Sequence, residues 1–410
     1  MKNKYVRFVF LVSVGFTACA PKINIAKVFA DAEKQTAIML IEVPKARAAK
    51  SAISSGGSPG AVGADLVSPR TVEGGQLRLV TSRDWTSGFF PGVLWFLHEY
   101  TGKNEWKMEA EKYTSNIEKE KTNGITHDMG FKIYTSFGNG FRLMGEPKYK
   151  EIILQSAKTL STRFHATTGV IKSWDNRPRW KYPVIIDNMM NLELLFAATR
   201  LSGDSSFYNI AVSHATTTMK NHYRPDYSSF HVVDYDSATG IVLQKTTHQG
   251  YSNESAWSRG QAWGLYGYTL CYRETKMKKF LEQADHIAHF ILTHPNLPND
   301  LVPYYDFDAQ GIPNEPRDAS AAAIMASALY ELSTLSNKGK SYKKAADKIM
   351  TNLTRHYRSA VGDNKGFMLL HSTGSAPSKS EVDVPINYAD YYYLEAWLRS
   401  KRLKEGKPLQ

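Results

Sequence analysis

The chain has 410 residues, which is long enough to bury a substantial core as one large domain or two. Its hydrophobic content of 42% and aromatic content of 12% are ordinary for a globular protein. The net charge of +12 suits acidic partners such as polyanionic polysaccharide fragments. Because the sequence has no long run of basic residues and no nucleic-acid-binding motif, we expect no nucleic acid partner.

The N-terminus has the pattern of a secretion signal. Three basic residues precede an apolar run that is too short to span a membrane, Phe8 to Phe16. The run ends at Thr17-Ala18-Cys19, which resembles the processing site of bacterial lipoproteins. We therefore expect residues 1–18 to be a signal peptide and Cys19 to be a lipidated first mature residue. Plain signal cleavage is the alternative, and either would place the protein in the periplasm or on the bacterial envelope.

Helical patterns dominate the rest of the chain. Residues 24–43 carry apolar positions at helical spacing, whereas residues 44–76 are predicted to form a loop. Beyond them, a Gly or polar turn followed by an aromatic residue recurs between helical segments, at Trp106, Tyr149, Tyr208, Phe280 and Tyr342. These turns predict about six helical hairpins, which must stack to bury their apolar faces. We expect an all-α fold, a closed α/α toroid formed by one domain over residues 24–405.

Long loops separate the predicted helices. They cover residues 72–87, 121–128, 165–187, 227–254, 294–318 and 360–388. One of them contains a pattern typical of a short β-hairpin at residues 229–247, which turns at Thr239-Gly240. Loops of this length in a compact domain usually bind a ligand, so we expect them to line a pocket.

Two aspartates stand at the predicted starts of helices. Asp128 lies in THDMGF, and Asp187 follows the apolar residues Val184, Ile185 and Ile186. Each has a structural explanation as a helix N-cap. If the two carboxyls instead share a partly desolvated cleft, their pKa values separate and one remains protonated near neutral pH, as a general acid in glycosidic chemistry requires.

Residues 248–268, HQGYSNESAWSRGQAWGLYGY, combine the side chains that bind acidic sugars. Arg259 offers a planar fork to a carboxylate, Trp257 and Trp263 offer flat faces to sugar rings, and Gln249 offers an amide to hydroxyls. Arg259 and Trp263 are four residues apart and share one face of a helix. The alternative is a buried amphipathic helix of the core.

Four phrases in register, DWTSGFFPG, HDMGF, IIDNMMN and HQGYSNESAWSRGQAW, make the chain similar to glycoside hydrolase family 88, the unsaturated glucuronyl hydrolases. The resemblance runs from about Pro69 to the DYYYLEAW segment that ends at Trp397. It implies an (α/α)6 barrel and an exo-acting enzyme. Such an enzyme removes the Δ4,5-unsaturated uronic acid that lyases leave on the non-reducing end of glycosaminoglycan fragments of chondroitin, heparin or hyaluronan type, by hydrating the C4=C5 double bond.

The resemblance also implies roles for individual residues. Asp187 falls at the general acid/base and Asp128 at the second essential carboxylate. The substrate-binding positions are Trp85, His127, His231, Thr247, Gln249, Trp257, Arg259 and Trp263. The C-terminal stretch departs from the family pattern, because Pro385-Ile386-Asn387-Tyr388 stands where a small Gly/Ser-rich loop is expected.

Two alternatives remain from the sequence. One is an unsaturated rhamnogalacturonyl hydrolase of family 105 on the same barrel, although Ser258-Arg259-Gly260-Gln261-Ala262-Trp263 favours family 88. The other is a glycan-binding lipoprotein without catalysis. The histidines lack metal-site spacing, and the chain has only Cys19 and Cys271, so we expect no metal, no cofactor and no disulfide framework. The sequence does not predict an oligomeric state.

Overall fold

The computed structural model describes residues 23–53, 65–175 and 177–409. The predicted signal peptide (residues 1–18) and the predicted lipidation site at Cys19 lie outside these residues and stay predictions. Across the described ranges, no helix combines the length and the apolar character that a membrane crossing requires.

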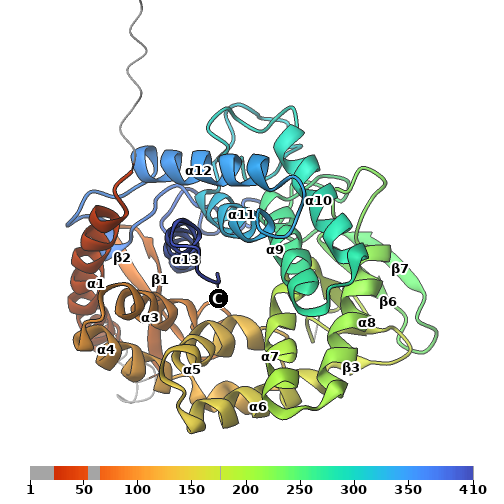
Figure 1. Ribbon diagram of the computed structural model, residues 1–410, viewed down its shortest axis with the longest axis horizontal. Helices are drawn as coiled ribbons and strands as arrows, with labels where there is room; N and C mark the ends of the chain where they lie inside the picture. The colour runs from red at the N-terminus through yellow and green to blue at the C-terminus, as the bar shows by residue number, and fades with distance from the viewer. Residues whose placement is uncertain (1–22, 54–64, 176, 410) are drawn as a thin grey trace, which may run out of the picture.

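Six helical segments form an inner ring in the described part of the chain (Figure 1). They are α3 (Phe89–Thr101), η3 continued by α5 (Gly130–Gly138 and Asn139–Met144), η4 continued by α7 (Ile186–Asn191 and Leu192–Ser202), α9 (Ser258–Thr275), α11 (Ala319–Leu332) and α13 (Asn387–Lys404). Each segment packs against the next, and α13 packs against α3, which closes the ring. The predicted α/α toroid of hairpins is confirmed.

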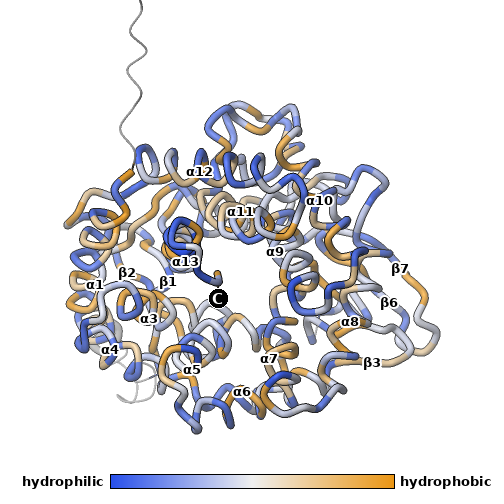
Figure 2. The backbone as a smooth tube through the Cα atoms, viewed as in Figure 1, coloured by the Kyte–Doolittle hydropathy of each residue, from blue (hydrophilic) through white to orange (hydrophobic). Residues whose placement is uncertain are grey.

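Six further helices surround this ring. They are α1 (Ile25–Ile53), α4 (Asn104–Ser115), α6 (Pro147–Ser161), α8 (Ser205–Asn221), α10 (Lys278–Thr293) and α12 (Gly339–His356). The aromatic residues that punctuate the sequence lie in the first turns of α4, α6, α8, α10 and α12 and pack onto the core. Figure 2 shows the hydrophobic α11 inside the more hydrophilic α12, as expected when the inner helix is buried on all sides.

Short β-strands lie in the segments that connect the helices. A hairpin pairs β1 (Leu66–Glu73) with β2 (Gln76–Thr81), a second pairs β3 (Phe164–His165) with β4 (Val170–Ile171), and a three-stranded antiparallel sheet joins β5 (Pro183–Ile185), β6 (Val232–Tyr235) and β7 (Val242–Thr246). The predicted hairpin at residues 229–247 corresponds to β6 and β7, and Gly240 has the positive φ (76°) of its turn.

The predicted loop over residues 44–76 is wrong in two parts. Helix α1 continues through Pro44 to Ile53, because the residues after the proline are mostly Ala, Lys and Arg, which are strong helix formers. The strand β1 and its turn were also missed. Gly74 and Gly75 both have positive φ, as a two-residue hairpin turn requires, and place Glu73 opposite Gln76.

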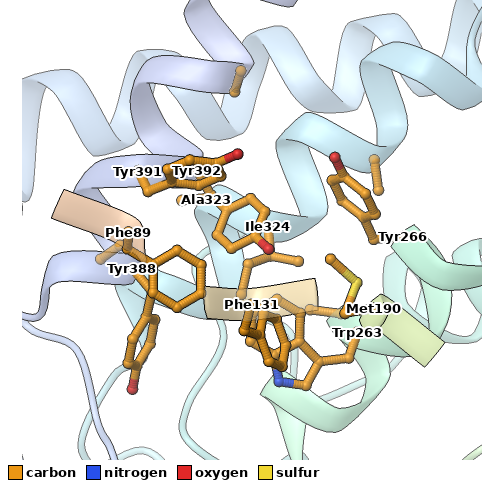
Figure 3. Close-up of a cluster of buried hydrophobic side chains, with 14 of the residues drawn as sticks. Phe89, Phe131, Met190, Trp263, Tyr266, Ala323, Ile324, Tyr388, Tyr391 and Tyr392 are labelled. Atoms are coloured by element: carbon orange, nitrogen blue, oxygen red, sulfur yellow. The ribbon is translucent and has the colours of Figure 1, made fainter. Parts of the chain in front are cut away.

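The core fills the middle of the inner ring with aromatic side chains. Phe89, Phe131, Trp263, Tyr388 and Tyr392 come from four different inner segments and contact one another (Figure 3). Because these rings fill the ring's centre, the barrel is a packed body in which the two ends of the inner helices are separate surfaces.

Candidate active site

The N-terminal ends of the inner helices gather at one end of the barrel. Inner and outer helices alternate along the chain, so the inner segments run in the same direction, and the long loops lead into their first turns. The residues found there include Trp85 before α3, Asp128 before η3, Asp187 in η4, Arg259 in α9 and Asp318 before α11. Helix N-termini carry partial positive charge, so this end favours an anionic ligand.

Asp187 is a buried carboxyl in the first turn of η4. It does not cap this helix, since Ile185 occupies the N-cap position without a side-chain bond, and Asp187 Oδ2 has no hydrogen-bond partner among the described residues. Burial, and to a smaller extent the charge of Asp128, raises the pKa of Asp187 to about 7, against the opposing charge of Arg259. Asp187 therefore carries a proton that it can give up near neutral pH.

The chain segments that carry Asp128 and Asp187 are in direct contact, which brings the two aspartates close together. An added Cβ on Gly130 would lie 2.7 Å from Asn191 Cα, and Asn191 Oδ1 accepts a hydrogen bond from Phe131 N at 3.1 Å. Asp128 does not cap η3 either, since Met129 occupies the N-cap position without a side-chain bond, and Asp128 Oδ2 instead accepts a hydrogen bond from Thr126 Oγ1 at 2.8 Å. The π-helix η3 follows it directly, and such irregular turns are frequent at functional sites.

Two histidines flank the carboxyls. His231 Nδ1 accepts hydrogen bonds from the backbone N–H groups of His248 and Gln249, each at 3.1 Å, so the proton of the neutral ring is on Nε2. That Nε2 lies 3.6 Å from Asp187 Oδ2, and burial holds the pKa of His231 well below its usual value. His127 Nε2 lies 3.3 Å from Asp128 Oδ1, and burial lowers the pKa of His127 too. Both predicted histidines are therefore neutral groups beside the two carboxyls.

Arg259 is buried and already engaged. Its Nη1 donates to Asp318 Oδ2 at 2.7 Å and to the carbonyl of Thr373, and its Nη2 donates to the carbonyl of Gly374. Its guanidinium also lies 4.5 Å from the centre of the Trp257 ring. This arrangement does not support the prediction of an open fork for the uronate carboxylate, because the two terminal nitrogens hold the C-terminal loop over the site. Only Nε lacks a partner among the described residues.

The three predicted tryptophans differ in exposure. Trp85 is half-buried and keeps surface for a sugar ring, while it packs against Tyr388 at 5.0 Å. Trp263 is fully buried between Phe131 and neighbouring rings, so it has no free face for a sugar, but its indole N–H lies toward Asp187. Trp257 is buried and packs against His231 at 4.6 Å.

The remaining predicted contacts organise the loop over residues 247–250. Thr247 Oγ1 accepts from Gly250 N at 2.8 Å, and Gln249 Nε2 donates to the Gly374 carbonyl at 3.0 Å. Both side chains are partly exposed beside His231. They shape the loop that orients His231 and join it to the C-terminal loop.

Sequence reasoning missed three residues at this end. Asp318 caps α11, and its pairing with Arg259 joins residues 59 positions apart. Tyr388 was noted only as a departure, yet its buried hydroxyl has no partner among the described residues. In Figure 3 that hydroxyl and the Trp263 nitrogen point to the same side, away from Tyr391 and Tyr392. Trp174, which lies 6.1 Å from His231, was also not singled out.

A separate cavity of about 370 Å³ occupies the opposite end of the barrel. It is lined mainly by residues of the inner helices and includes Glu99, which pairs with both Arg142 and Arg402. None of the predicted site residues lines it. In the described ranges, no group of three His, Cys, Asp or Glu side chains is placed to hold a metal ion.

Comparison with known proteins identifies the family. Residues 68–400 match the model of Glycosyl Hydrolase Family 88. An unsaturated glucuronyl hydrolase of Formosa agariphila is 52% identical over 327 residues, which are 79% of this chain and 82% of the relative. An unsaturated chondroitin disaccharide hydrolase of Streptococcus pneumoniae is 33% identical over 329 residues, 78% of this chain and 83% of the relative.

Solved structures agree with this assignment. The crystal structure of an unsaturated glucuronyl hydrolase specific for heparin has a TM-score of 0.83 and 44% identity and covers 92% of this chain and 98% of its own. The crystal structure of an unsaturated glucuronyl hydrolase from Bacillus sp. GL1 has a TM-score of 0.78 and 30% identity. The match covers 83% of this chain and 91% of that protein. The family and fold predictions are confirmed, and the family 105 alternative is left without support. The chain belongs to glycoside hydrolase family 88.

Proposed function

We propose that this chain is an exo-acting hydrolase that removes the Δ4,5-unsaturated uronic acid from the non-reducing end of glycosaminoglycan fragments. The observation that carries the proposal is the protonated Asp187, with its pKa raised to about 7, beside the Asp128 carboxylate and a neutral His231. The family membership and the 52% identity to an unsaturated glucuronyl hydrolase support it.

The chemistry follows from these groups. Asp187 donates its proton to C4 of the double bond, and C5 becomes cationic with its charge shared by the ring oxygen. The Asp187 carboxylate then accepts a proton from the water that adds to C5, so the acid is restored and one water is consumed. Asp128 stabilises the cation by its charge. The hemiketal formed at C5 opens the ring, and the remaining sugar is released from C1.

The substrate class is acidic. The six inner-helix N-termini and the basic net charge of the chain favour a uronate at this end of the barrel. A relative of 44% identity is specific for heparin, and another of 33% identity hydrolyses unsaturated chondroitin disaccharides. We propose that both substrate types enter the same site, with the unsaturated uronate beside Asp187.

The test is incubation with unsaturated disaccharides from heparin, chondroitin and hyaluronan. Hydration removes the conjugation between the double bond and the carboxylate, so turnover appears as loss of ultraviolet absorbance. Asp187→Asn, which keeps the shape of the side chain but has no acidic proton, is the inactive control. If no substrate in the panel loses absorbance, the proposed hydrolase activity is refuted.

We also propose export to the periplasm or envelope, on the basis of the basic-then-apolar pattern of residues 1–18 and the Cys19 site. The expected result is that the protein fractionates with membranes in its bacterial host and that Cys19→Ala releases it. A soluble cytoplasmic protein with residues 1–18 intact would contradict this.

A further inference from the structure

A basic groove lies next to the candidate active site and has no role in the chemistry above. Its volume is about 420 Å³, and it is lined by Lys172, Trp174, Arg177, Pro178, Trp180 and Lys181. These residues belong to the segment between β4 and β5, immediately before Asp187. The groove therefore lies on the chain segment that leads through β5 to the proposed acid.

Ring contacts join the groove to Asp187. The Trp174 ring lies 5.3 Å from His248 and 6.1 Å from His231, whose Nε2 lies 3.6 Å from Asp187 Oδ2. The Trp180 ring also lies 6.1 Å from His248 and 5.5 Å from Trp174. A sugar attached to a uronate at Asp187 has this groove as a direct continuation.

Three cations at the groove are exposed and have no close carboxylate partner among the described residues. Arg177 and Lys181 line the groove, and Arg179 stacks on its lining residue Trp180. All three are exposed, and none forms an ion pair with a carboxylate in the described part of the chain, although the charge of Lys181 acts on Asp236. Lys172 differs, because it pairs with Asp175 at 3.1 Å. Besides burial, the charges of Arg177 and Arg179 lower the pKa of His248, so their field extends to the active-site loop.

The two arginines are held in orientations that suit an anion. The guanidinium of Arg177 lies 5.5 Å from the centre of the Trp174 ring, and that of Arg179 lies 4.9 Å from the centre of the Trp180 ring. Trp180 is itself fixed by its indole N–H, which donates to Thr246 Oγ1 at 3.1 Å. A guanidinium resting on an indole keeps its N–H donors free at the edge, where they match the oxygens of a sulfate or carboxylate.

We propose that Arg177, Arg179 and Lys181 bind the sulfate or carboxylate groups of the sugars on the leaving side of the scissile bond. This inference rests on the proposed function, because an exo-acting enzyme keeps the unsaturated ring at Asp187 and the rest of the oligosaccharide extends outward. The groove selects charged leaving groups and takes no part in proton transfer.

The test compares two triple variants of the full chain. One carries Arg177→Gln, Arg179→Gln and Lys181→Gln, and the matched control carries Gln at Lys340, Lys344 and Lys348. The three control lysines are exposed on α12 and are likewise without an ion pair among the described residues. Both variants lose three positive charges, so general electrostatic attraction to the protein falls equally.

The substrates are an unsulfated disaccharide, a sulfated disaccharide and an unsulfated tetrasaccharide with a second uronate, all unsaturated. For the groove variant we expect KM to rise about five- to tenfold on the sulfated disaccharide, the tetrasaccharide or both, with kcat within about twofold. KM for the unsulfated disaccharide stays unchanged. At about 1 M salt, where screening acts within about 3 Å, the difference shrinks. A rise for only one of the two charged substrates identifies sulfate or carboxylate as the bound group.

Two results would overturn the inference. One is an unchanged KM for both charged substrates in the groove variant, and the other is an equal rise in the α12 control. If the unaltered chain turns over none of the three substrates, the proposed function itself fails, and this outcome is distinct because it appears before any variant is compared.

Discussion

Replacing Asp187 with asparagine should abolish activity and at the same time stabilise the protein. The pKa of this carboxyl rises from 3.8 to about 7, mainly because burial disfavours its charge. At about 1.4 kcal/mol for each pH unit, the native state prefers the protonated form by about 4 kcal/mol. Asparagine has no charge to bury, although its amide still needs partners, so we expect a net gain of about 1–2 kcal/mol at pH 8.

The sign of the pH dependence follows from proton binding. Between about pH 4 and pH 7 the folded chain holds a proton on Asp187 that the unfolded chain has lost, so native stability falls as the pH rises through this window. The Asp187→Asn variant has no carboxyl at this position, so its stability does not fall with pH for this reason. Relative to the unaltered chain, the variant should be less stable by about 2–3 kcal/mol near pH 4 because of its unpaired amide, and its relative stability should rise up to about pH 7. Above that pH its advantage of about 1–2 kcal/mol stays constant, as measured by denaturant unfolding at several pH values.

Asp390 provides the contrast. Burial raises its pKa to about 7 as well, but both of its oxygens accept backbone N–H bonds, from Met368 and Leu369, at 2.9 Å each. An asparagine there turns an NH₂ group toward one of these donors, so at the same pH Asp390→Asn should be less favourable than Asp187→Asn by about 1–3 kcal/mol. If Asp187→Asn is destabilising at pH 8, desolvation is not what raises the pKa of Asp187.

Three further substitutions test the site. Arg259→Lys keeps the charge but cannot bridge Asp318 and two carbonyls at once, so kcat/KM should fall at least tenfold with a lower Tm; an unchanged kcat/KM would remove Arg259 from the site. Tyr388→Phe removes a buried hydroxyl that has no hydrogen-bond partner among the described residues, so kcat should fall while Tm changes little. Unchanged kinetics would show that Tyr388 contributes only packing. Gly130→Ala places a Cβ 2.7 Å from Asn191 Cα, so it should lower the free energy of unfolding by about 1–3 kcal/mol and reduce kcat. Full activity would show that the site does not depend on this close contact between the segments of Asp128 and Asp187.

The barrel and its two carboxyls were predictable because their signals are local. In the sequence, a turn followed by an aromatic residue indicates each helical hairpin, and the two aspartates lie in short motifs at the starts of helices. Asp128 and Asp187 were accordingly placed without knowledge of the fold. Their proximity was not predictable, because it depends on the packing of Gly130 against Asn191 across 61 positions of sequence.

The roles within residues 248–268 were harder to predict for the same reason. A helix that carries Arg259 and Trp263 on one face is compatible with sugar binding and with a buried core, and the sequence left both open. The role of Arg259 is set by its hydrogen-bond partners, which are Asp318 and the carbonyls of Thr373 and Gly374. They lie 59 to 115 positions away in the sequence. The nitrogen of His231 that carries the proton is likewise set by two distant backbone donors.

The C-terminal stretch that departs from the family pattern completes the site by joining the segments before α13 and before α3. Asn387 Nδ2 donates to the carbonyls of Pro69 and Thr86 at 2.8 and 3.0 Å, and Arg70 binds Glu381 through two nitrogens. These contacts span about 300 positions, so they form only when α13 has docked on α3 and closed the ring. Because the same loop accepts the hydrogen bonds of Arg259 at Thr373 and Gly374, the site is complete only in the closed barrel. Loss of ring closure should therefore abolish activity before the inner helices themselves unfold.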